Sequence, residues 1–81
     1  MNNNKLLAAK LGRQILGGEI TNSEFYELFP VDTNDDEIET LYSLIEHIPK
    51  AGGLFGVSKK TYELYIFDIL DMIEKLEKKG S

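Results

Sequence analysis

The stretch SKKTYELYIFDILDMIEKLEK, residues 58–78, decides the fold class of this 81-residue chain. Its apolar residues recur at the spacing of one helical face: Tyr62, Tyr65, Ile66, Ile69, Leu70, Ile73 and Leu76. That face is widened by Leu64, Phe67 and Met72. Ser58 stands where an N-cap is needed. So broad an apolar arc predicts a helix over residues 59–78 that is either the central element of a bundle or half of an interface.

Two further helices are expected before Pro30. Apolar residues at helical spacing predict one over residues 4–16, which ends at Gly17-Gly18 because glycine adopts the left-handed conformation of a helix C-terminus. Gly12 within it costs about 1 kcal/mol relative to alanine, so we expect another element to pack closely there. The capping box Thr21-Asn22-Ser23-Glu24 predicts a short second helix over residues 22–28.

A third helix is expected over residues 35–48, where an apolar stripe runs up to Pro49. Its N-cap is left open between Thr33 and Asn34. In the glycine-rich loop that follows, Leu54 and Phe55 either pack onto the core or form an exposed contact patch. No segment alternates with the period of a strand. The chain therefore predicts a single all-α domain over residues 1–81, a small four-helix bundle with a short second helix.

The composition limits the classes of function. The sequence contains no cysteine, so disulfides and thiolate metal sites are excluded, which suits a reducing cytoplasm. No apolar run approaches the roughly 20 residues that span a bilayer, and the first residues lack the pattern of a secretion signal. A pI of about 4.7 disfavours direct nucleic-acid binding, because such domains are normally basic along one face. We expect a cytoplasmic protein that binds neither membranes nor nucleic acid.

Charge is segregated along the chain. Residues 14–49 hold nine carboxylates and no Lys or Arg, whereas the other residues hold nine basic and five acidic side chains, a net charge of +4. Such a field repels phosphate backbones and attracts a basic partner. The candidate partner-binding residues lie along and beside the acidic third helix, with one tyrosine from the start of the fourth: Asp32, Asp35, Asp36, Glu39, Ser43, Glu46, His47 and Tyr62.

The third helix treats its charges differently from the fourth. Asp35, Glu39 and Glu46 share one stripe, and no cation is spaced along that helix to relieve their repulsion, which costs a few tenths of a kcal/mol for carboxylates four residues apart. The fourth helix instead places Lys75 four residues after Asp71. This contrast favours a functional acidic surface over a merely solvated face.

Three motifs that suggest a metal, a phosphate or a catalytic group fail on inspection. The segment 32–36 begins like a calcium loop, but its sixth position is Glu37 rather than Gly and its twelfth is Ser43 rather than Glu. Residues 52–59 lack the Gly-Lys-Ser/Thr ending of a phosphate loop. His47 has no second histidine or cysteine for a zinc set, and Ser43 meets only the spacing of a nucleophile. We expect no enzymatic activity, no cofactor and no metal.

Two segments in this order define a resemblance: ILGGEITNSEF, residues 15–25, and LYSLIEHIP, residues 41–49. The chain resembles the colicin D type of bacterial immunity proteins, in which a first helix leads into an Ile-Thr-x-x-Glu-Phe capping segment and a later helix ends in an acid shortly before a proline. The likeness covers nearly the full length, mostly at apolar and capping positions.

The resemblance implies a small acidic inhibitor that occupies the basic cleft of a tRNase-like toxin nuclease and imitates the phosphates of its substrate. Glu46 takes the place of the family's acid ahead of the proline. After Pro49 the family continues with further acids, whereas this chain continues with Lys50 and a glycine-rich loop, so the identity of the toxin is not implied. The alternative hypothesis is a helical interaction module that homodimerises through the helix at 59–78, with the acids serving only solubility.

Overall fold

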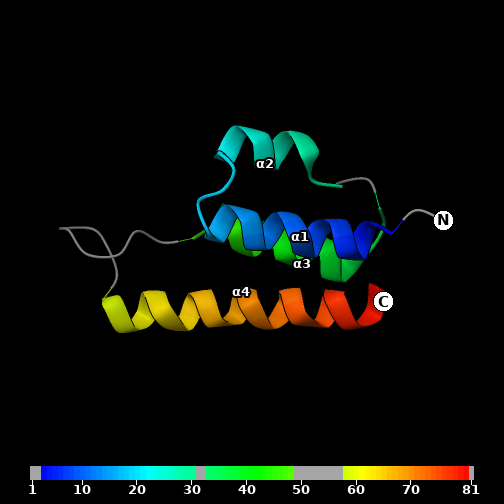
Figure 1. The fold of residues 1–81 in the computed structure, drawn as a ribbon. Helices are drawn as coiled ribbons and strands as arrows, with labels where there is room; N and C mark the ends of the chain where they lie inside the picture. The colour runs from blue at the N-terminus through cyan, green and yellow to red at the C-terminus, as the bar shows by residue number, and fades with distance from the viewer. Residues whose placement is uncertain (1–2, 31–32, 49–57, 81) are drawn as a thin grey trace.

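The computed structural model describes residues 3–30, 33–48 and 58–80. These residues form four helices and no strand: α1 (Asn4–Leu16), α2 (Asn22–Leu28), α3 (Asp36–Glu46) and α4 (Lys59–Gly80). The prediction of an all-α bundle with a short second helix is confirmed. α4 runs antiparallel to α1, and α2 lies on the opposite side of α1 from α4 (Figure 1). α1 contacts all three other helices.

The first two helices begin and end where the sequence predicts. The C-terminus of α1 is closed by Gly18, whose φ is +73°, and by hydrogen bonds from the amides of Gly18 and Glu19 back to the carbonyls of Ile15 and Gln14. The capping box of α2 is complete, because the Thr21 hydroxyl accepts from the Glu24 amide at 3.1 Å while the Glu24 carboxylate accepts from the Thr21 amide at 3.0 Å. Local sequence therefore fixes both helix ends.

The ends of α3 and α4 differ from their predicted positions. Neither Thr33 nor Asn34 caps α3: the Asp35 carboxylate does so, accepting from the amides of Glu37 and Ile38 at 3.0 and 3.3 Å. Asn34 instead adopts a left-handed conformation with φ of 54°. α3 ends at Glu46, two residues earlier than predicted, and α4 continues to Gly80, two residues further.

The core lies where the four helices meet. Its buried side chains come from every helix and from the end of α2: Ala8, Ala9, Leu11, Phe25, Phe29, Ile38, Leu41, Ile45, Ile69, Ile73 and Leu76. Gly12 is in close contact with α4, since a Cβ atom there would lie 3.0 Å from Cδ1 of Ile73. The expected close packing at this glycine is confirmed.

α4 buries most of its broad apolar arc within the bundle. Ile69, Ile73 and Leu76 are buried, and the Tyr65 hydroxyl donates to the Leu44 carbonyl of α3 at 2.6 Å. Leu64 and Phe67, which widen the predicted arc, point outward and remain 55% and 62% exposed. α4 is thus a core element of the monomer, with two apolar side chains left on its outer side.

The prediction for Leu54 and Phe55, which placed them either in the core or in an interface, falls on residues 49–57, which lie outside the described residues.

Within the described ranges, none of the helices combines the length and apolarity that crossing a membrane requires.

Candidate protein-binding surface

The outer side of α3 brings together five of the eight predicted binding residues. These residues are all exposed, and we call them the acidic face of α3: Asp36, Glu39, Ser43, Glu46 and His47. Among the described residues, no cation pairs with the carboxylates of Glu39 and Glu46. The face therefore presents negative charge to solvent that the described fold does not neutralise.

Asp35 does not belong to this face. Its carboxylate is partly buried, caps α3 and forms an ion pair with the Lys5 ammonium of α1. The hydrogen bond from Lys5 lowers the pKa of Asp35, and the amides of Ile38 and Glu37 lower it further, while burial opposes them. The prediction that Asp35 lacks a relieving cation is wrong, because the cation comes from another helix.

Glu37 is neutralised in the same way. Its carboxylate accepts a hydrogen bond from the Lys79 ammonium at 2.7 Å, which ties the first turn of α3 to the end of α4. A third interhelical pair joins α1 to α4, where Arg13 donates twice to the Glu77 carboxylate at 2.7 and 2.8 Å. These three ion pairs join the helices to one another. The acids on the outer side of α3, Glu39 and Glu46, take part in none of them.

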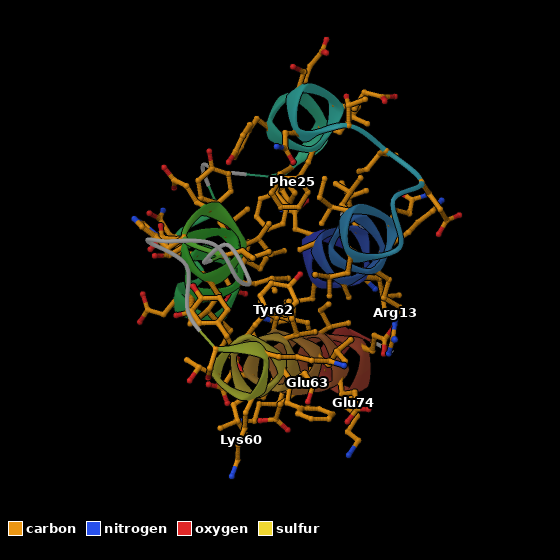
Figure 2. The ribbon with its side chains drawn as sticks, turned by 90° about the vertical axis from the view of Figure 1, so that its left-hand side faces the viewer. Arg13, Phe25, Lys60, Tyr62, Glu63 and Glu74 are labelled. Atoms are coloured by element: carbon orange, nitrogen blue, oxygen red, sulfur yellow. The ribbon has the colours of Figure 1, made fainter. Side chains whose placement is uncertain are left out.

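Besides Asp35, the structure places one more predicted binding residue, Tyr62, away from the acidic face. Asp32 lies outside the described residues. Tyr62 is half-buried and points into the bundle between α4 and α1 (Figure 2).

On the acidic face itself, Nδ1 of His47 lies 2.8 Å from the backbone carbonyl of Ser43. Because a carbonyl only accepts hydrogen bonds, this nitrogen is the donor. His47 thus contacts the backbone of Ser43, and among the described residues its ring makes no hydrogen bond to the Ser43 hydroxyl.

A small pocket opens beside the acidic face, between the end of α2 and α3. It has a volume of about 160 Å³ and is lined by Phe29, Pro30, Glu39 and Tyr42. We call it the aromatic pocket. The rings of Phe29 and Tyr42 lie 5.3 Å apart with an interplanar angle of 49°. Glu39 thus lines the same pocket as two aromatic residues.

The aromatic wall continues beyond the pocket. Tyr26 meets Tyr42 edge to face at 5.7 Å, and Phe25, which lies at the centre of α1, α2 and α3 (Figure 2), stacks on Tyr42 at 6.1 Å. Burial raises the pKa of the Tyr42 phenol, and the nearby Glu46 carboxylate and Tyr26 raise it further. Glu46 therefore acts on the same aromatic group that lines the pocket.

Of the four pocket residues, sequence reasoning identified Glu39 and missed the other three. Pro30 marked only the end of a helix, Phe29 had no assigned role, and Tyr42 was only part of the apolar stripe of the third helix. One signal was available: Tyr42 comes three residues after Glu39 and four before Glu46, so the three share one side of α3. Nothing local indicates that the end of α2 closes over that side.

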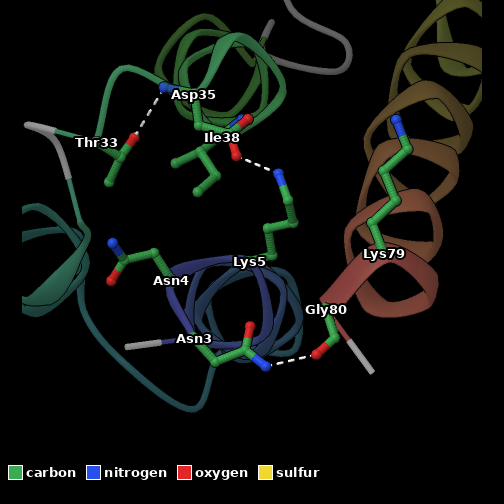
Figure 3. Close-up of a pocket in the computed structure, with 8 residues that line it drawn as sticks. All are labelled: Asn3, Asn4, Lys5, Thr33, Asp35, Ile38, Lys79 and Gly80. Carbon is green, nitrogen blue, oxygen red and sulfur yellow. Dashed lines mark hydrogen bonds and ion pairs between the residues drawn. The ribbon is translucent and has the colours of Figure 1, made fainter. Parts of the chain in front are cut away.

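A larger pocket, of about 360 Å³, lies where the start of α1 meets the end of α4. Figure 3 shows Lys5 turned toward Asp35 and the Asn3 amide toward the Gly80 carbonyl. Both lysines that line this pocket, Lys5 and Lys79, are already paired with carboxylates. It offers no free charge for an anion.

The groups on this surface are carboxylates and aromatic rings, without a cluster of metal ligands. In the part of the chain that the structure describes, no three His, Cys, Asp or Glu side chains gather as metal ligands do. The acidic face and aromatic pocket combine unpaired carboxylates with aromatic rings, which suits a cationic protein surface. No protein-family model matches the chain, and comparisons with curated proteins and with solved structures find no significant match.

Proposed function

We propose that this chain is a cytoplasmic immunity protein that binds a basic toxin nuclease domain and inhibits it. The acidic face of α3 would occupy the cleft that normally holds the phosphates of a nucleic-acid substrate. The observation that supports this proposal is the contrast within one helix: Asp35 and Glu37 are paired, whereas Glu39 and Glu46 are exposed without a cation partner among the described residues.

Electrostatics gives such an inhibitor a fast encounter with its target. A net charge of −5, concentrated over residues 14–49, steers a basic domain toward α3 and raises the association rate. Salt screens this attraction over a distance of about 8–10 Å at physiological ionic strength. The association rate should therefore fall steeply with added salt, while the dissociation rate changes less. The chain itself performs no reaction in this mechanism.

The proposal predicts that a neighbouring gene encodes a large protein with a basic C-terminal nuclease domain. That domain is the partner to purify, and its cleavage of RNA and DNA is measured with and without this chain. We expect stoichiometric inhibition and an association rate that decreases with salt. The proposal is overturned if no such gene lies nearby, or if the nuclease activity of the domain is the same with and without this chain.

A second candidate function is homodimerisation through α4. The observation that favours it is the exposure of Leu64 and Phe67, both more than half accessible on the outer side of that helix. Because the rest of the apolar arc is buried in the monomer, such an interface would be small. Size-exclusion chromatography with light scattering decides: a tight dimer that Phe67→Ser dissociates and salt does not affect supports this function, and a monomer excludes it.

A further inference from the structure

We propose that the aromatic pocket binds one arginine side chain of the basic partner and so positions the partner on the acidic face of α3. This inference rests on the proposed function only for the statement that the partner is a basic protein. It adds a defined anchor, made by Phe29, Pro30, Tyr42 and Glu39, to what is otherwise a field of negative charge.

The size of the pocket suits a side chain rather than a free ligand. Pockets that bind drug-sized molecules have volumes of about 300–1,000 Å³, whereas the aromatic pocket has about 160 Å³. Interfaces are commonly anchored by single large side chains that fill pockets of this kind, and arginine is among the residues most enriched at such positions.

The walls of the pocket suit a planar cation. Tyr42 is half-buried and is the ring that can attract a positive charge at the pocket, while Phe29, only 4% exposed, and Pro30 add apolar wall. Glu39 lines the same pocket, and its carboxylate is paired with no cation among the described residues. A guanidinium stacks on aromatic rings and forms two parallel hydrogen bonds with a carboxylate, which an ammonium does not do. Arginine therefore fits better than lysine.

The surroundings exclude an anionic occupant and favour a cationic one. Glu46 acts electrostatically on Tyr42, so a second carboxylate contributes to the potential at the pocket. The nearest helices, α2 and α3, lie within residues 14–49, where the sequence has no Lys or Arg. Charge complementarity thus selects a basic side chain from the partner.

The experiment uses two labelled peptides, hexa-arginine and hexa-lysine, which carry equal charge, and measures their binding to the full chain by fluorescence anisotropy at low salt. We expect hexa-arginine to bind about two- to fivefold more tightly, as expected for an exposed cation–aromatic contact. Glu39→Gln should weaken hexa-arginine binding more than Glu63→Gln, which removes an equal charge from an exposed site on α4 (Figure 2).

A second pair of variants tests the ring. Tyr42→Phe keeps the aromatic face and should keep the preference for arginine, whereas Tyr42→Leu should abolish it. Tyr42 is half-buried, so thermal unfolding is recorded for both variants. Glu39 is exposed, and its variant therefore tests the pocket even if Tyr42→Leu fails to fold.

A two-dimensional NMR titration locates the site, and the expected result is that the ring signals of Phe29 and Tyr42 shift most on adding hexa-arginine. Equal binding of the two peptides, with no difference between Glu39→Gln and Glu63→Gln, overturns the arginine pocket and leaves the acidic face as the proposed inhibitor surface. Absence of binding by either peptide also overturns the pocket. The nuclease assay decides the proposed function separately, because it does not depend on either peptide.

Discussion

Two groups of carboxylates on the same helix have opposite surroundings. Asp35 and Glu37, at the start of α3, form ion pairs with lysines from α1 and α4. Glu39 and Glu46 are exposed on the outer side of α3, Glu39 beside the end of α2, and no described residue pairs with them. The first group contributes to the fold, and the second is available to a partner.

This difference shows how residues 14–49, which contain no Lys or Arg, determine which acids of α3 find a cation partner in the folded chain. α1 and α4 begin or lie outside residues 14–49 and bring lysines to the start of α3. α2 lies wholly inside that stretch, so packing it beside α3 supplies aromatic rings and no cation. The negative potential on this side of α3 therefore has two causes: α3 carries exposed acids, and the neighbouring helix α2 has no Lys or Arg to neutralise them.

The largest expected effect comes from removing the aromatic residue beneath the exposed acids. Phe25→Ala should destabilise the fold by about 3–5 kcal/mol, because the ring is 1% exposed and contacts Phe29 and Tyr42. Leu28→Ala is the matched control, since Leu28 is on the same helix and 54% exposed. Thermal and urea unfolding measure both. Equal stability of the two variants would show that α2 is not held to the bundle through Phe25.

The next largest effect is on partner binding and tests whether Glu39 and Glu46 serve binding while Asp35 and Glu37 serve stability. Replacing Glu39 and Glu46 together by glutamine should weaken binding of the toxin domain by about 2–5 kcal/mol, because the partner's cations would be left buried without a carboxylate. Stability should be unchanged or slightly higher, since no ion pair is lost. Titration calorimetry measures the change in affinity for the toxin domain, and thermal unfolding measures the change in stability.

The control for that variant is Glu63→Gln with Asp68→Asn, which removes the same charge from exposed positions on α4. This control should bind the toxin domain nearly as well as the wild type does. If both double variants lose affinity equally, the effect is one of net charge, and the acidic face of α3 has no special role.

A smaller effect, on stability alone, is expected at the start of α3. Asp35→Ala should cost about 1–2 kcal/mol, because it removes the N-cap of α3 together with the ion pair to Lys5. Asp36→Ala, one residue further and exposed, should stay within about 0.5 kcal/mol of the wild type. Denaturant unfolding of the two variants shows whether the Asp35 carboxylate stabilises the fold. If only Asp36→Ala is destabilised, Asp36 and not Asp35 is the stabilising residue at the start of α3.

The smallest effect is a dependence of stability on acid pH. The pKa of Asp35 is lowered from its ordinary value of 3.8, chiefly by the hydrogen bond from Lys5, and the pKa of Glu77 is lowered from 4.5, chiefly by that from Arg13. The unfolded chain therefore binds more protons in this range. Stability from both groups is complete above their ordinary pKa values and is lost as pH falls below about 4 toward the folded values.

Thermal unfolding between about pH 6 and pH 3 measures this loss. Asp35→Ala combined with Glu77→Gln should make the decline shallower. Both carboxylates are partly solvent-exposed, with side-chain accessibilities of 20% and 38%, so screening by water keeps the effect modest. An unchanged slope in the double variant would show that other carboxylates govern the acid response.

The helices were predictable because their signals are local. Apolar periodicity and glycine, proline and capping residues placed α1 and α2 at their observed bounds and α3 and α4 within two residues of theirs. The same local reasoning found the exposed acids of α3, because Glu39 and Glu46 lie beside its apolar stripe and not within it. It failed at Asp35, where spacing along one helix says nothing about a lysine from another.

By itself, the sequence determined an all-α chain whose net negative charge comes from residues 14–49, since periodicity, capping and charge order are properties of neighbours along the chain. Only the tertiary structure decided which acids are free. Lys5 and Lys79 reach Asp35 and Glu37 from 30 and 42 residues away. The aromatic pocket likewise exists only because α2 folds back beside α3, and contacts between segments so far apart depend on how the helices pack.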